Sequence, residues 1–320
     1  MIMNALGKIL LLIVCQFIAS QLIGQNIFRL YDKAKNDKVI QLIHDNPSLS
    51  NKYDKDGLTI LDIAVIRSDL EFAKRLLDNG VNIDTRDQIS TTSLMVAAFR
   101  NSYEMANFLI SRGADVNLKS ANGATCLMLA SKNADFSLIE LLINNGASVN
   151  SVAINGMTPL LYAAIYNSKQ TCELLLTKGA DVNAKNNDGL TALMFACGCP
   201  FNETDIQKEN RDIIQLLLSN NADMNVKDNK GFTALHYASR EGYYTLIEPL
   251  LNYGADINSL TNFGFTPLYL AAYNNNFNIV KLLVEKGAKI DIRCNDGTNA
   301  ANIALIKGYT FIADYLNSVH

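Results

Sequence analysis

The residues of this sequence that could do chemistry are few, and Cys197-Gly-Cys199 is the only closely spaced pair of cysteines beyond the N-terminal segment. Two thiols at this spacing could form a reversible disulfide or supply two ligands to a metal ion. A structural zinc site needs four ligands, and no histidine lies near this pair in the sequence. We therefore predict no metal site, and we keep a cysteine-based redox or enzymatic role through Cys197 and Cys199 as the alternative function.

Catalysis by histidine finds little support in the sequence. The three histidines are His44, His236 and His320, and none can be matched with a serine, a cysteine and an acid in a triad-like pattern. The glycine motifs of P-loop and Rossmann proteins do not occur either. Asp54-Lys-Asp56-Gly57 begins like a calcium loop but lacks the later ligands, so we interpret it as a turn. We predict a non-catalytic protein that needs no cofactor.

Charge and cysteine usage limit the classes of partner. The chain has 28 lysines and arginines against 31 acidic residues, a net charge of −3, with no basic cluster. A nucleic-acid-binding protein needs a basic surface, so we predict no nucleic-acid partner. Five cysteines lie beyond the N-terminal segment at irregular spacing, which is not a disulfide framework. We interpret Cys126 and Cys172 as small apolar core residues.

A 33-residue repeat carries these side chains, and its clearest copy runs from Ala153 to Lys185. Thr158 can cap a helix through its hydroxyl, and Pro159 suits the first helical position. We expect Gly179 to end a second helix, because glycine adopts the left-handed conformation that closes a helix. This closing residue recurs every 33 residues, apart from one nine-residue shift, at Gly80, Gly113, Gly146, Gly179, Asn221, Gly254 and Gly287.

A second signature begins each copy, as in Gly156-Met-Thr158-Pro-Leu160 and Gly231-Phe-Thr233-Ala-Leu235-His236. In its period and in this core the sequence resembles the ankyrin repeat, from about Asn26 to the C-terminus. The resemblance implies an all-α solenoid of stacked helix–turn–helix units with short β-hairpin turns. It also implies that His236 is a structural hydrogen-bonding residue.

The register predicts one ankyrin repeat domain at 25–320, with about nine repeats and capping units at 25–53 and 294–320. In the last unit Asn299 replaces the capping threonine. An insertion at about 198–210 lengthens the connection between two helices of one repeat. Insertions in solenoids often lie on the binding face, but surface loops also cost little stability, so both interpretations stay open.

Residues 1–24 have the pattern of a secretory signal peptide. Lys8 precedes the apolar run Ile9–Val14, and Ser20 and Gly24 provide small residues for cleavage. The apolar stretch is short for a membrane span. We predict an exported protein, periplasmic or secreted, without membrane insertion once the signal is removed; anchoring by an uncleaved segment is the alternative.

The resemblance implies a concave binding face, formed by the hairpin tips and the exposed side of each first helix. Aromatic and arginine side chains, which are enriched at protein interfaces, occupy several positions of this face. Packing of Phe232 on Phe265 across adjacent hairpins is the alternative use of two of them. The predicted partner-binding residues are Phe99, Arg100, Met157, Tyr166, Phe232, Arg240, Phe263, Phe265 and Tyr273.

These features together predict a protein–protein interaction scaffold that binds a partner protein on its concave face and is itself a monomer. The partner is either an envelope protein of the same cell or a protein of a host, in which case the chain is a secreted effector.

Overall fold

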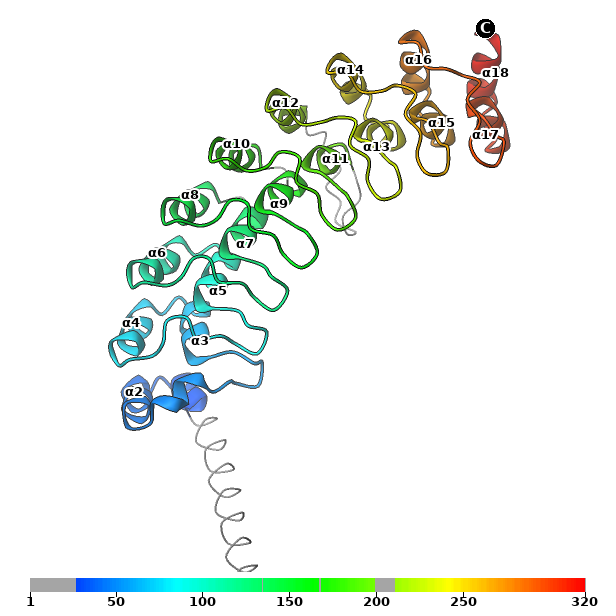
Figure 1. Ribbon diagram of the computed structural model, residues 1–320. Helices are drawn as coiled ribbons and strands as arrows, with labels where there is room; N and C mark the ends of the chain where they lie inside the picture. The colour runs from blue at the N-terminus through cyan, green and yellow to red at the C-terminus, as the bar shows by residue number, and fades with distance from the viewer. Residues whose placement is uncertain (1–26, 134, 167, 199–210, 320) are drawn as a thin grey trace, which may run out of the picture. The chain divides into compact units, whose positions relative to one another are not determined.

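The computed structural model describes residues 27–133, 135–166, 168–198 and 211–319 (Figure 1). The predicted signal peptide and most of the predicted insertion, including Cys199, lie outside these residues. The chain divides into two compact units, Met1–Ser148 and Val149–His320, which are described separately. Among the described residues of both units, α-helices predominate and the one β-bridge joins Arg86 to Thr92. The prediction of an all-α fold is confirmed.

The first unit is a stack of helix pairs that follows a capping segment. The cap consists of the helical residues 27–32, α2 (Asn36–Asp45) and the short 3-10 helix η1 (Pro47–Asn51). Three pairs follow, in which the first helices pack in one row and the second helices in another (Figure 1). The pairs are α3 (Ile60–Ile66) with α4 (Leu70–Asp78), α5 (Ser93–Phe99) with α6 (Tyr103–Ser111), and α7 (Cys126–Asn133) with α8 (Phe136–Asn144).

The second unit contains five pairs arranged in the same way. Its first helices are α9 (Pro159–Ile165), α11 (Ala192–Ala196), α13 (Ala234–Glu241), α15 (Pro267–Tyr273) and α17 (Ala300–Ile306). Its second helices are α10 (Lys169–Thr177), α12 (Arg211–Ser219), α14 (Tyr244–Asn252), α16 (Phe277–Glu285) and α18 (Thr310–Ser318).

The signature residues begin and end the helices as their chemistry dictates. The Thr158 hydroxyl accepts a hydrogen bond from the Leu161 amide at 3.3 Å, and Pro159 is the first residue of α9. Gly179 has φ +85° just beyond α10, and Asn221 adopts φ +64° at the equivalent place beyond α12. These left-handed residues end the second helices, as the sequence predicts.

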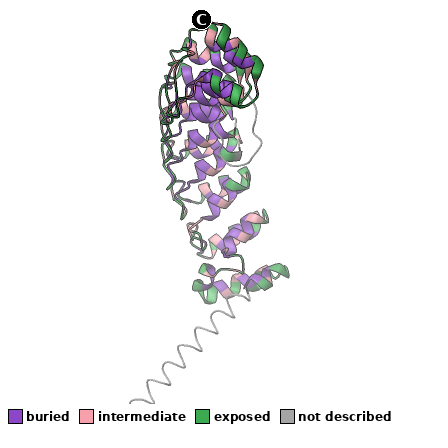
Figure 2. Ribbon diagram, turned by 90° about the vertical axis from the view of Figure 1, so that its right-hand side faces the viewer, coloured by how far each residue is buried: buried purple, intermediate pink, exposed green. Residues whose placement is uncertain are grey.

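One buried leucine in each first helix from α3 to α15 forms the spine of the core, and Ala301 takes this position in α17. Leu61, Leu94 and Leu127 in the first unit are no more than 1 % exposed, and so are their counterparts in the second unit, Leu160, Leu193, Leu235 and Leu268. Burial of each leucine side chain is worth roughly 1.5–3 kcal/mol relative to exposure. Figure 2 shows the buried residues following the helices of both units, with exposed residues along the edges.

Asparagine side chains join successive repeats where the second helices end. The Asn117 amide nitrogen donates to the Gly146 carbonyl at 2.9 Å, while its oxygen accepts from the Ser148 amide at 2.9 Å. In the second unit Asn150 makes the same two bonds, to the Gly179 carbonyl at 2.8 Å and the Asp181 amide at 2.9 Å. Each such residue satisfies two backbone groups of the following repeat, which fixes the spacing of neighbours.

Candidate protein-binding surface

The turn loops and the first helices together form one face of each unit, called the loop face below. The last residue of a first helix repeatedly brings a large side chain to this face. Phe99 ends α5 and is 55 % exposed, Tyr273 ends α15 and is 40 % exposed, and Ile306 ends α17 and is 67 % exposed. Helix ends are suited to this role, because the side chain there extends beyond the packed turns.

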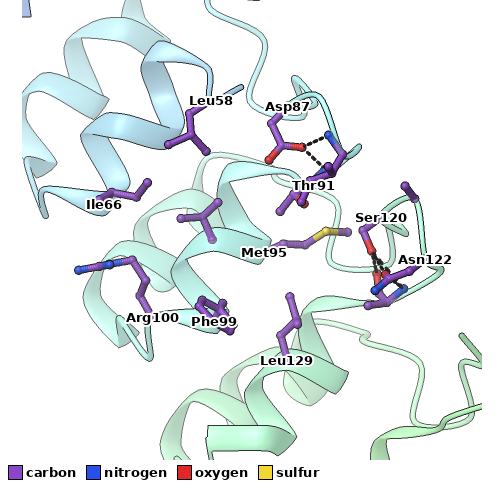
Figure 3. A pocket seen from close by; sticks show the side chains of 14 residues that line it. Leu58, Ile66, Asp87, Thr91, Met95, Phe99, Arg100, Ser120, Asn122 and Leu129 are labelled. Carbon is purple, nitrogen blue, oxygen red and sulfur yellow. Dashed lines mark hydrogen bonds between the residues drawn. The ribbon is translucent and has the colours of Figure 1, made fainter. Parts of the chain in front are cut away.

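In the first unit the loop face contains an apolar groove of about 630 Å³. Residues of α3, α5 and α7 line it, together with residues of the loops that precede these three helices (Figure 3). Its size lies within the range of roughly 300–1,000 Å³ typical of ligand pockets. The lining residues are Leu58, Ile66, Asp87, Ile89, Thr91, Met95, Val96, Phe99, Arg100, Ser120, Ala121, Asn122, Ala124 and Leu129.

The polar groups of this groove are largely occupied by the loops themselves. The Asp87 carboxylate accepts hydrogen bonds from the Ile89 amide at 2.9 Å and the Thr91 amide at 2.7 Å (Figure 3). In the next loop the Ser120 hydroxyl donates to Asn122 Oδ1 at 2.6 Å, and that oxygen also accepts from the Ala124 amide at 3.1 Å. The groove therefore presents mainly apolar surface.

Two cations stand at the rim of this groove. Lys132 Nζ lies 5.9 Å from the centre of the Phe99 ring, within the range of a cation–π contact. Arg100 is exposed, and it forms no ion pair with any residue that the structure describes.

In the second unit the loop face carries a row of stacked rings. The centres of the Phe263 and Phe265 rings are 5.6 Å apart, and Phe265 stacks on Tyr269 at 4.6 Å. Lys307 Nζ lies 4.1 Å from the centre of the Tyr273 ring. Phe263 is 51 % exposed, so this row ends in an open aromatic side chain.

Comparison with known proteins identifies the architecture. A family model described as ankyrin repeats (3 copies) matches residues 30–120, 94–186, 127–228, 185–261 and 246–319. Together these matches cover most of the chain. The chain belongs to the ankyrin repeat family. Ankyrin repeats generally serve as scaffolds for protein–protein interaction and are typically non-enzymatic.

A solved ankyrin repeat structure has the same fold. The crystal structure of the human ASB11 ankyrin repeat domain superposes with a TM-score of 0.63 at 26 % sequence identity. The match covers 72 % of this chain and 98 % of the ASB11 domain. No curated protein matches this ankyrin repeat chain at a significant level.

For two of the predicted contact residues of this ankyrin repeat protein, the prediction of an exposed side chain is wrong. Met157 is completely buried and Phe232 is 9 % exposed. Each directly follows a turn glycine, and its carbonyl accepts the amide that closes the turn, from Ala153 to Met157 and from Asp228 to Phe232. In these two repeats the side chain lies beneath its loop, whereas Leu58 and Phe265 at the same position are half-buried.

The remaining predicted contact residues lie at or near the surface. Phe99, Arg100, Phe263 and Tyr273 are exposed, while Tyr166, Arg240 and Phe265 are half-buried. Phe232 and Phe265 each pack on a tyrosine of their own repeat: Phe232 lies 5.4 Å from Tyr237, and Phe265 stacks on Tyr269. Arg240 covers the Tyr237 ring at 4.9 Å.

The prediction omitted two of the most exposed apolar side chains of the loop face. Ile89 and Ile306 are each 67 % exposed. Their signal was available in the repeat, because Ile306 lies 33 residues after Tyr273 and Ile89 occupies the same register position as Phe263. Isoleucine lacks the enrichment at protein interfaces that marks aromatic, methionine and arginine side chains.

The cysteines that could do chemistry lie in the core, wherever the structure describes them. Cys197 is completely buried, and burial raises the pKa of the Cys126 and Cys172 thiols to about 12. A reactive thiol needs exposure and a lowered pKa, and the thiols of Cys126 and Cys172 have neither. Within the described ranges, no three histidine, cysteine or acidic side chains gather as metal ligands.

His236 has the structural role that the resemblance implies. Its Nδ1 accepts a hydrogen bond from the Thr233 amide at 3.1 Å, which closes a capping box at the start of α13. Its Nε2 lies 3.0 Å from the Ser259 carbonyl and 3.1 Å from the Phe265 carbonyl, so Nε2 carries the hydrogen. Burial of the ring lowers its pKa to about 4.

Proposed function

We propose that this ankyrin repeat protein is a non-catalytic scaffold that binds a partner protein on its loop face. The observation that carries the proposal is the apolar groove of the first unit, with Ile89 and Phe99 more than half exposed at its edge. Large exposed apolar side chains gathered around a groove are typical of interaction sites on soluble proteins. Aromatic anchors of this kind contribute much of the binding free energy at protein interfaces.

Affinity capture with matched variants tests this proposal. Phe99→Ala removes an anchor from the loop face, whereas Tyr103→Ala removes an aromatic side chain of similar exposure (45 %) at the start of α6 in the same repeat. Each variant and the wild-type protein are crosslinked in the producing cell, and captured proteins are quantified by mass spectrometry. A partner that is depleted with Phe99→Ala and retained with Tyr103→Ala supports the loop face. The proposal is contradicted if both variants lose the same captured proteins to the same extent, or if neither variant loses any.

We also propose that the protein acts outside the cytoplasm of its cell. The support is the sequence of residues 1–24, where one positive charge at Lys8 precedes a short apolar run. In the described part of the chain, no helix is long and apolar enough to span a bilayer. N-terminal sequencing of the protein from the producing cell is expected to start at Gln21 or Gln25, after the small residues Ser20 and Gly24. An intact Met1 in the cytoplasmic fraction would refute export.

A further inference from the structure

The groove of the first unit has a composition that selects the chemistry of its ligand. Its walls are apolar side chains that are only partly covered: Leu58 and Ile66 on one side, Val96 in the middle and Leu129 on the other. These side chains can exclude water from a bulky apolar group of a ligand. Leucine, isoleucine, methionine or phenylalanine in a partner would provide such a group.

The exposed charged side chain in the lining of this groove is a cation. Asp87, the one carboxylate of the lining, is buried and receives two backbone amides. Arg67, one repeat before Arg100 in the register, is paired with Asp32. Arg100 alone among the described lining residues offers an exposed cation, and it has no acidic partner among the described residues.

We propose that this groove binds a segment of the partner protein in which a bulky apolar residue is followed or preceded closely by Asp or Glu. The apolar side chain enters the space between Ile66, Val96 and Leu129, and the carboxylate accepts hydrogen bonds from the Arg100 guanidinium. Arginine suits this task, because its planar fork can donate two parallel hydrogen bonds to one carboxylate. This inference rests on the proposed binding function and adds the chemistry of the partner.

Selection from a random twelve-residue peptide library displayed on phage tests the inference. The bait is the purified protein, and parallel selections use Arg100→Glu and the control Lys74→Glu. Lys74 is exposed on α4, a second helix, so both substitutions change the net charge equally. Circular dichroism first establishes that each variant is folded.

The wild-type protein and Lys74→Glu are expected to enrich peptides that combine a large apolar residue with Asp or Glu. Arg100→Glu should lose this acidic preference, and a synthetic peptide from the selection should bind it about 10-fold more weakly or worse. Phe99→Ala should also bind the same peptide more weakly, because the substitution removes the edge of the groove.

Two results would overturn the inference while leaving the proposed function standing. The first is enrichment of apolar peptides with no preference for Asp or Glu; the second is an acidic preference that survives Arg100→Glu. A selection that yields no peptide sensitive to Phe99→Ala also overturns it. Failure of the scaffold function itself appears separately, in the capture experiment with Phe99→Ala and Tyr103→Ala.

Discussion

The buried imidazole of His236 should make the second unit sensitive to mild acid. Burial lowers the pKa of His236 to about 4 in the folded chain, while an unfolded histidine titrates near 6.5. The unfolded chain therefore binds more protons between these two values, and protonation favours unfolding. The stability that depends on a neutral His236 is fully present above pH 6.5 and is lost as the pH falls towards 4.

The pKa difference sets the size of this effect. Each pKa unit corresponds to about 1.4 kcal/mol, so the whole shift is worth about 3 kcal/mol. Between pH 7.5 and pH 5 the linkage relation gives a loss of about 2 kcal/mol in unfolding free energy. His44, the other histidine whose side chain is described, is exposed in the capping segment.

Urea denaturation of the wild-type protein and of His236→Gln, followed by circular dichroism at pH 7.5 and 5, measures this effect. Glutamine retains an acceptor for the Thr233 amide but has no titrating group, so the variant should lose about 2 kcal/mol less on acidification. Carboxylates titrate in both proteins and cancel in the comparison. Parallel losses in the two proteins, or an NMR titration that places the His236 pKa near 6.5, would refute the reasoning.

Three further outcomes follow from other residues. Burial raises the pKa of Asp62 above its ordinary value of 3.8. The unfolding free energy should therefore fall as the pH rises through the raised pKa, because the buried carboxyl group then loses its proton. The urea midpoint of Asp62→Asn should fall less than that of the wild-type protein over the same pH range. Gly179→Val should lower the unfolding free energy by about 1 kcal/mol or more, because valine resists φ +85°, and an unchanged midpoint would exclude the helix-closing role. Tyr273→Ala should weaken the binding of a captured partner by about 1–3 kcal/mol, as measured by calorimetry. Tyr244→Ala, on the second helix α14, should leave the affinity for that partner unchanged.

The repeat register predicted most of the fold because each signature residue acts through its own backbone. Thr158 caps a helix, Pro159 starts one, and both functions depend on neighbours within a few residues. Asn221 could likewise replace glycine in the left-handed position, since asparagine tolerates it better than most residues.

Burial of the variable positions could not be predicted in the same way. Whether Met157 or Phe232 faces solvent depends on how the turn folds over its own first helix, which the period does not encode. The groove depends on what neighbouring repeats leave empty: Ala121 and Ala124 are short side chains in the loop that faces Phe99 and Leu129. A cavity of this kind arises from three repeats at once, so it has no sequence motif of its own.

The asparagine bonds between repeats have a mechanical consequence. The side chains of Asn150 and its counterparts bond to the following repeat, so a force applied along the chain would load these joints one after another. Each repeat that detaches would release a length of about 110 Å for its 33 residues, and about 140 Å for the repeat that ends at Asn221, 42 residues after Gly179. Single-molecule stretching would then record the register of the sequence as a series of nearly equal steps, with one longer step marking the insertion.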